Sequence, residues 1–122
     1  MIVTVKKIID SAQALEELSA EKNIKIKDAF RIAKLLNAIQ TEMSSYNSAR
    51  IAALEMYAVL DLKTNQYMFK SSEDEAEFKE QHEELIKETI EIAGDPIKLS
   101  VLSNASLSVG ALTALEWMLH ED

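Results

Sequence analysis

Side chains that could carry chemistry are few in this 122-residue chain, which has two histidines and no cysteine. The stretch His82-Glu83-Glu84-Leu85-Ile86 begins like a zinc-protease helix, but Ile86 stands where the second histidine ligand would be. A di-iron helix would need a glutamate three residues before the histidine, and that residue is Lys79. The sequence therefore predicts no metal site. We interpret His82 as a histidine on an apolar helix face, and His120 lies near the chain end.

Nucleophilic and phosphate-transfer chemistry find little support either. The chain has no cysteine thiolate and no nucleophile-elbow motif, and its two glycines exclude a glycine-rich phosphate loop. Acid–base chemistry by glutamates alone stays open, because the separation of two carboxylates is not visible in a sequence. We expect a protein that is not an enzyme and needs no cofactor.

The most concentrated charge is a run of acids in residues 73–95. This segment holds ten acids and two bases, an excess equal to the formal net charge of the whole chain, −8. On a helix, five of its glutamates would share one face: Glu77, Glu80, Glu84, Glu88 and Glu91. Such a stripe is either a solvated helix face or a docking surface for a basic protein, with mimicry of a nucleic-acid backbone as one form of the latter. Direct nucleic-acid binding is not expected, because it needs a net basic footprint.

A second candidate surface is the apolar seam of a long helix before this run. Its members step by four and three residues: Ile32, Leu36, Ile39, Met43, Tyr46, Arg50, Ala53 and Tyr57. This heptad spacing predicts one helix over residues 28–60, roughly 50 Å long. A compact domain of this size is only about 35 Å across, so the helix either protrudes or bends. If it bends, we expect the bend at Ser44-Ser45 and Asn47-Ser48, which form the stretch with the weakest helix propensity.

Arg50 is the charged member of this seam. Its stem either covers apolar surface while the guanidinium reaches a carboxylate at the edge, or the residue forms a buried ion pair or clamps a ligand. If the helix protrudes, part of the seam must meet another chain. We therefore expect Arg50, Tyr46 and Tyr57, together with the glutamate stripe, to bind a partner protein or a second copy.

The acidic run is predicted to form a helix over residues 73–89 that makes a hairpin with the long helix. Ser72 and Glu75 have the spacing of a capping box, and acids in the first turn suit the helix dipole. One face of this helix carries Phe78, His82, Leu85 and Thr89. The expected hairpin would lay this face against the distal part of the long helix.

The rest of the chain predicts two further helices and several short strands. Helical spacing covers residues 7–21 and starts again near residue 108. Strand-like alternation marks residues 1–5, 24–26, 67–69 and 90–92. The expected fold is a single α+β domain, mostly α, with four helices. No stretch has the pattern of a signal peptide or a membrane span, so a cytoplasmic protein without membrane contact is expected.

Three stretches, in this order, resemble a loose group of small acidic proteins encoded by bacteriophages and prophages. They are the helix start at residues 26–36, the acidic residues 75–92, and the leucine-rich ending at residues 97–102 and 112–119. The resemblance spans residues 24–119 and brings no catalytic residue with it. It implies a phage setting, in which small helical proteins serve as assembly chaperones, minor virion components or inhibitors of host defence.

These features predict a non-enzymatic helical module for protein–protein interaction, acting in virion assembly as a chaperone or minor structural component. The alternative is an inhibitor of a host defence or nucleic-acid enzyme that presents the acidic helix as a decoy. Either would work in the host cytoplasm, and the first could also stay with the virion. The expected partner is a protein or a second copy, with no metal, membrane or nucleic acid.

Overall fold

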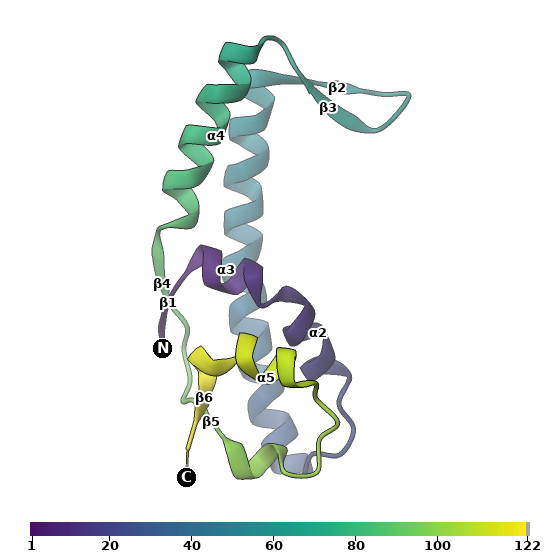
Figure 1. The fold of residues 1–122 in the computed structure, drawn as a ribbon, viewed down its shortest axis with the longest axis vertical. Helices are drawn as coiled ribbons and strands as arrows, with labels where there is room; N and C mark the ends of the chain where they lie inside the picture. Colours follow the sequence, from purple (N-terminus) through teal and green to yellow (C-terminus); the bar gives the residue numbers. More distant parts are fainter. Residues whose placement is uncertain (122) are drawn as a thin grey trace.

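The computed structural model describes residues 1–121 as an elongated, mostly helical α+β fold (Figure 1). The chain order is β1 (Ile2–Thr4), α1 (Val5–Asp10), α2 (Ala12–Ala20), α3 (Ile26–Tyr57), β2 (Ala58–Asp61), β3 (Gln66–Phe69), α4 (Ser72–Ile86), β4 (Thr89–Glu91), β5 (Ile97–Lys98), η1 (Leu99–Leu102), α5 (Val109–Ala114), η2 (Glu116–Met118) and β6 (Leu119–His120). The strands form three separate pairs, β1 with β4, β2 with β3, and β5 with β6.

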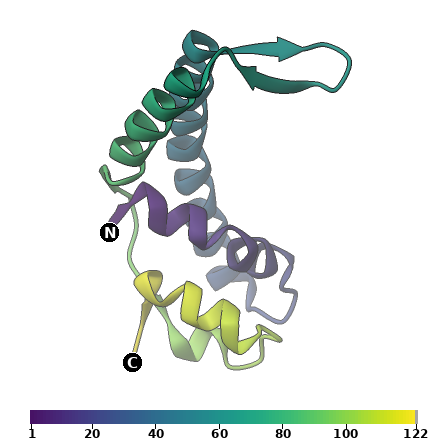
Figure 2. The same cartoon turned by 45° about the horizontal axis from the view of Figure 1, so that its top comes forward.

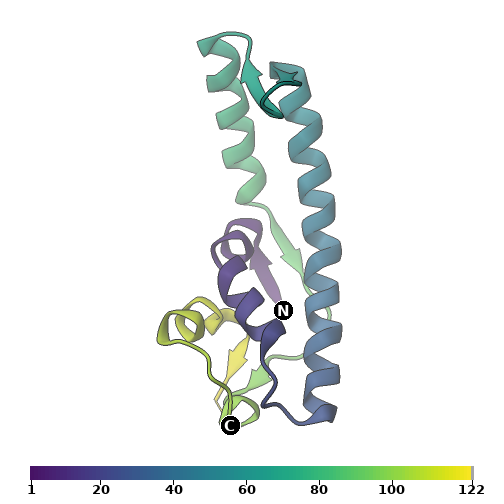
Figure 3. The same ribbon diagram turned by 90° about the vertical axis from the view of Figure 1, so that its right-hand side faces the viewer.

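The helix α3 is unbroken over 32 residues, which makes it about 48 Å long. It runs along one side of the molecule, and its second half extends past every other element except α4 and the β2–β3 hairpin (Figure 3). The expected long helix is confirmed, and of the two alternatives the structure shows protrusion and no break at Ser44 or Asn47. Serine and asparagine cost only some tenths of a kcal/mol each relative to alanine, and packing on α4 outweighs this cost.

Both ends of α3 differ from the expectation. The strand expected over residues 24–26 is absent, because no neighbouring strand pairs with it and the helix already begins at Ile26. At the other end the helix stops at Tyr57 and not at residue 60, because Ala58 adopts extended backbone angles. Residues 58–60 then join β2, so the chain leaves the helix axis at this point.

The strands β2 and β3 form an antiparallel hairpin that projects sideways from the end of the α3–α4 pair (Figure 1, Figure 2). Ala58 pairs with Phe69 and Asp61 with Gln66. The turn between them closes at Asn65, whose φ of 57° lies in the left-handed region that asparagine tolerates. The strand expected at residues 67–69 is confirmed, with Gln66 added.

The acidic helix α4 packs against α3, as expected for the predicted hairpin (Figure 3). Its capping residue is Ser71, whose Oγ accepts a hydrogen bond from the backbone N–H of Asp74 at 3.1 Å, and not the predicted Ser72. The helix ends at Ile86, three residues before the expected end, and the chain enters β4 at Thr89. Glu75 and Lys79, four residues apart on α4, form an ion pair at 3.1 Å.

The helix expected over residues 7–21 is divided at Ser11 into α1 and α2. It starts earlier than predicted because the Thr4 side chain accepts a hydrogen bond from the Lys7 N–H and caps the first turn. Ser11 is buried, and its Oγ lies 3.0 Å from the carbonyl oxygen of Ala114, far along the chain. This tertiary contact marks the break between α1 and α2, although the helical spacing of residues 7–21 continues through Ser11.

The chain end forms a compact cap over α2. The helix expected near residue 108 is confirmed as α5, but it gives way to the 3₁₀ turn η2 after Ala114. The strand β6 then pairs in parallel with β5, Ile97 with Leu119. The strand expected at residues 90–92 is confirmed as β4, shifted by one residue, and β1 pairs with it in an antiparallel register.

The molecule thus has a body, residues 1–43 and 87–121, and an arm, residues 44–86. The main hydrophobic cluster lies in the body: Val3, Ile8, Ala14, Leu18, Ile32, Leu35, Ile39, Ile92, Ile97, Leu102, Ala111, Leu115 and Met118. The arm consists of the second half of α3, the β2–β3 hairpin and α4. Among the described residues, no helix is long and apolar enough to cross a membrane.

Candidate protein-interaction site

The face of α3 predicted as a binding seam is shared between the body and α4. Ile32 and Ile39, in its first half, are buried in the main cluster. In its second half, the hydroxyl of Tyr46 lies 2.6 Å from His82 Nε2 on α4. The His82 ring stacks on Phe78 with 5.8 Å between centroids, and Phe78 meets Phe69 of β3 at 5.6 Å. The second half of the seam, which was expected to meet another chain, therefore packs against α4 of the same chain.

Tyr57 and Arg50 are also engaged within the arm. Tyr57 is half-buried, and its hydroxyl accepts a hydrogen bond from Gln81 Nε2 of α4 at 2.7 Å. Arg50 is half-buried too, and its guanidinium donates to Asn47 Oδ1 at 2.9 and 3.2 Å. The polar partner of Arg50 is an amide one turn away, and within residues 1–121 no carboxylate lies in ion-pair range, so neither of the ion pairs expected for Arg50 is formed. The ligand clamp stays a prediction.

The acidic stripe is exposed along its whole length. Glu77, Glu80 and Glu84 lie on α4, whereas Glu88 follows the helix and Glu91 belongs to β4. Because α4 ends at Ile86, Glu88 and Glu91 do not share the helix face that was expected for all five glutamates. Within residues 1–121 the one ion pair is Glu75–Lys79, which leaves all five stripe carboxylates without a basic partner.

A groove between α3 and α4 brings several of the predicted residues together. Its volume is about 500 Å³, and it is lined by Ala49, Arg50, Ala53, Phe78, Gln81, His82, Glu84, Leu85 and Glu88. Arg50 and the carboxylates of Glu84 and Glu88 thus share one depression. Tyr46 reaches it only through His82, and Glu77, Glu80 and Glu91 lie outside it.

The β2–β3 hairpin is a candidate surface that the sequence analysis missed. Four apolar side chains at this end of the molecule are largely exposed, Met56 at 67%, Val59 at 58%, Leu62 at 87% and Met68 at 60%. Val59 and Met68 are a cross-strand pair and so lie on the same face of the hairpin. The alternation in residues 66–69 and the turn residues before them were available signals, but residues 58–60 were assigned to the helix.

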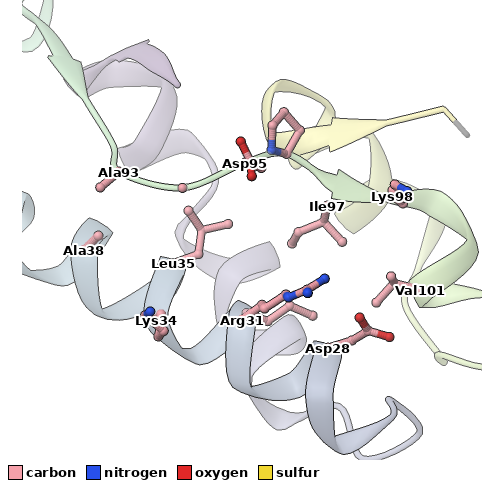
Figure 4. Close-up of a pocket in the computed structure, with 13 residues that line it drawn as sticks. Asp28, Arg31, Lys34, Leu35, Ala38, Ala93, Asp95, Ile97, Lys98 and Val101 are labelled. Carbon is pink, nitrogen blue, oxygen red and sulfur yellow. The ribbon is translucent and has the colours of Figure 1, made fainter.

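A larger groove of about 730 Å³ lies in the body between α3 and the segment that holds β5 (Figure 4). Its apolar floor includes Leu35 and Ile97, and Leu35 Cδ1 would lie 3.4 Å from a Cβ at Gly94, whose φ is +122°. The charged lining has both signs: Asp28, Arg31, Lys34, Asp95 and Lys98. Histidine, serine and threonine are absent from the lining.

Residues 1–121 contain no cluster of three or more acidic or histidine side chains that could hold a metal ion. The pKa of Glu21 is lowered because its carboxylate accepts hydrogen bonds from the backbone N–H groups of Asn23 and Ser106. This exposed carboxylate joins the end of α2 to the loop before α5 and is a structural tether.

Comparison with known proteins adds no relative. Neither a scan against protein-family models nor searches of the curated proteins and the solved structures find a match for this chain. What the protein does is therefore inferred from its own surfaces.

Proposed function

We propose that the protein is a non-enzymatic module for protein–protein interaction whose docking surface is at the end of the arm. The observation that carries this proposal is the exposure of Met56, Val59, Leu62 and Met68 on and beside a projecting hairpin. A two-stranded hairpin is only marginally stable by itself in water. Large apolar side chains gathered at such a place are typical of a surface that another protein covers.

The setting that the sequence resemblance implies is a phage infection. In that setting the protein acts in virion assembly as a chaperone or minor structural component, within the host cytoplasm or with the virion. The elongated shape supports such a role, because the body can fold around its own core while the arm reaches a partner. The proposal needs no cofactor and no catalytic residue.

Light scattering of the purified protein, alone and mixed with purified virion structural proteins, tests the proposal. A double variant, Val59→Ser with Met68→Ser, should weaken any complex, because it removes the exposed apolar pair and leaves the buried residues in place. The matched control is Ile2→Ser with Val109→Ser, two exposed apolar residues of the body. A strict monomer that binds none of these proteins contradicts the proposal, as does equal weakening by both variants.

A second candidate function rests on the acidic stripe. Its five exposed carboxylates have no basic partner among residues 1–121, so a basic surface can approach them without first breaking an ion pair. The protein would then inhibit a host defence or nucleic-acid enzyme by occupying the groove that normally holds a nucleic-acid backbone. Opposite potentials would speed the encounter and make it sensitive to salt.

Charge reversal distinguishes this candidate from the first. Lysine at Glu77, Glu80, Glu84 and Glu88 should abolish inhibition of such an enzyme and leave the folded state intact, because all four side chains are exposed. The control carries the same charge change on exposed acids of the body: Asp10, Glu16, Glu116 and Glu121. Unchanged inhibition by the arm variant, or equal loss in the control, rejects the decoy function.

A further inference from the structure

The strand β3 has a free edge whose hydrogen-bonding groups can be assigned. The N–H of Lys70 donates to the carbonyl oxygen of Tyr57 at 3.2 Å, just beyond the paired residues of the hairpin. Hydrogen-bonded and non-hydrogen-bonded pairs alternate along an antiparallel ladder, so Val59–Met68 is hydrogen-bonded within the hairpin. The backbone N–H and C=O groups of Tyr67 and Phe69 therefore point away from β2, toward the free edge.

This edge lacks the charges, prolines and bulges that protect many edge strands. Gln66, Tyr67, Met68 and Phe69 include no charged residue, no proline and no bulge. The sheet has two strands, and among the described residues no third strand pairs with β3. The open edge and the exposed Val59–Met68 pair belong to the same hairpin, so one partner can satisfy both.

We propose that the strand which covers this edge is β3 of a second copy of the chain, in antiparallel orientation. This inference rests on the proposed function of the hairpin as a docking surface and names its partner. With Met68 on a two-fold axis, Tyr67 of each copy forms a hydrogen-bonded pair with Phe69 of the other. All four outward backbone groups of each strand are then used, and the two hairpins become one four-stranded sheet.

Side chains and charges are complementary in this register. Val59 and Met68 of both copies form one continuous apolar strip across the four strands, because paired residues share a face of the sheet. The antiparallel arrangement also places the turn of each hairpin, with Lys63, beside the start of α4 in the other copy. That first turn carries Glu73, Asp74 and Glu75, so opposite charges meet twice across the axis.

A charge-swap experiment tests the two-fold register. Met68→Lys and Met68→Glu each place like charges on the axis, so light scattering should show a dimer for the wild type and a monomer for each variant. An equimolar mixture of the two variants should regain twice the monomer mass as a heterodimer. The control pair, Val109→Lys and Val109→Glu, changes another exposed apolar residue and should leave the dimer unchanged.

A single cysteine gives a second readout, since the chain has none of its own. In the proposed register, Met68 of the two copies face each other as a non-hydrogen-bonded pair. Such residues have Cα atoms about 4.5 Å apart, within the range of a disulfide. Met68→Cys should therefore be converted to a covalent dimer on mild oxidation, much faster than the exposed control Val109→Cys.

Three outcomes would overturn the inference: a monomeric wild type, persistence of the dimer in both charged variants, or failure of their mixture to form a heterodimer. A wild-type monomer that still binds a virion protein through Val59 and Met68 would overturn this inference alone and support the proposed function. A stable dimer that binds no virion protein would support this inference and contradict the proposed role in virion assembly.

Discussion

The body and the arm share the helix α3 but are held together differently. The main hydrophobic cluster lies in the body, whereas the buried apolar residues described in the arm are Leu54, Ala58 and Ile86. The arm relies on a row of aromatic rings between β3, α4 and α3 and on hydrogen bonds of half-buried side chains. Because apolar burial is the largest favourable term in folding, the body should provide most of the free energy of unfolding.

This difference indicates how the two regions divide the work of the molecule. A region with few buried apolar contacts opens locally at lower free-energy cost than a packed core. The arm is therefore the part that a partner, or a second copy, can stabilise by binding.

The largest effect should come from truncating the core of the body. Leu115 is 0% exposed, and Leu115→Ala should lower the free energy of unfolding by about 3 kcal/mol. Leu54→Ala, at 8% exposure in the arm, should cost about 2 kcal/mol because its surroundings can relax. Urea denaturation followed by Trp117 fluorescence reports unfolding of the body. Far-UV circular dichroism in the same titration reports loss of the helices, those of the arm included, and the two signals together measure both values. An equal or greater loss for Leu54→Ala would contradict the contrast.

Next in size is the buried hydroxyl of Ser11. Its Oγ lies 2.6 Å from the carbonyl oxygen of Lys7 and accepts a hydrogen bond from Trp117 Nε1 at 3.0 Å. Ser11→Ala leaves the indole N–H without its partner and should cost about 2 kcal/mol. The exposed Ser19→Ala serves as control, measured by the same denaturation. If both variants unfold alike, the hydroxyl does not join these elements of the body.

A smaller effect is expected at the cap of α4, within the arm. Ser71→Ala removes the hydrogen bond to the Asp74 N–H and should cost about 1 kcal/mol. Ser72→Ala changes the neighbouring serine, which does not cap the helix. It should raise the stability by some tenths of a kcal/mol, because alanine has a higher helix propensity than serine. Hydrogen exchange should show faster opening of α4 in the Ser71 variant, with protection in the body unchanged. The reverse ranking would restore Ser72 as the cap.

The smallest effect is the pH dependence that Glu21 contributes. Hydrogen bonds to its carboxylate hold its pKa below the ordinary value of 4.5 in the folded state. Its stabilisation is therefore complete above the unfolded pKa and is lost as the pH falls through the folded pKa. Glu21→Gln should remove that part of the stability change between pH 6 and 3, read as urea midpoints. Because the tether joins two parts of the body, hydrogen exchange in the arm should not respond.

Much of the fold followed from local patterns in the sequence. The four-three spacing from Ile32 to Tyr57 identified α3, and the acidic run with its early acids identified α4, because helical periodicity is a local property. The division of the first helix at Ser11 was not predictable, since its partners Ala114 and Trp117 lie about a hundred residues along the chain. The sequence placed Glu77, Glu80 and Glu84 correctly on α4, and their role in binding stays a prediction. The exposed pair Val59 and Met68 was missed, because residues 58–60 suit a helix as well as a strand.

The sequence by itself determined which side chains are available: no thiol, two histidines, and an acid excess confined to residues 73–95. It also predicted a long helix that either protrudes or bends, and it left that choice open. Only the tertiary structure decided that the seam of this helix packs on the core and on α4, so that the exposed apolar surface of the arm is the hairpin beyond it. The physical reason is that periodicity shows which residues share a face, while contacts between distant segments select what that face meets.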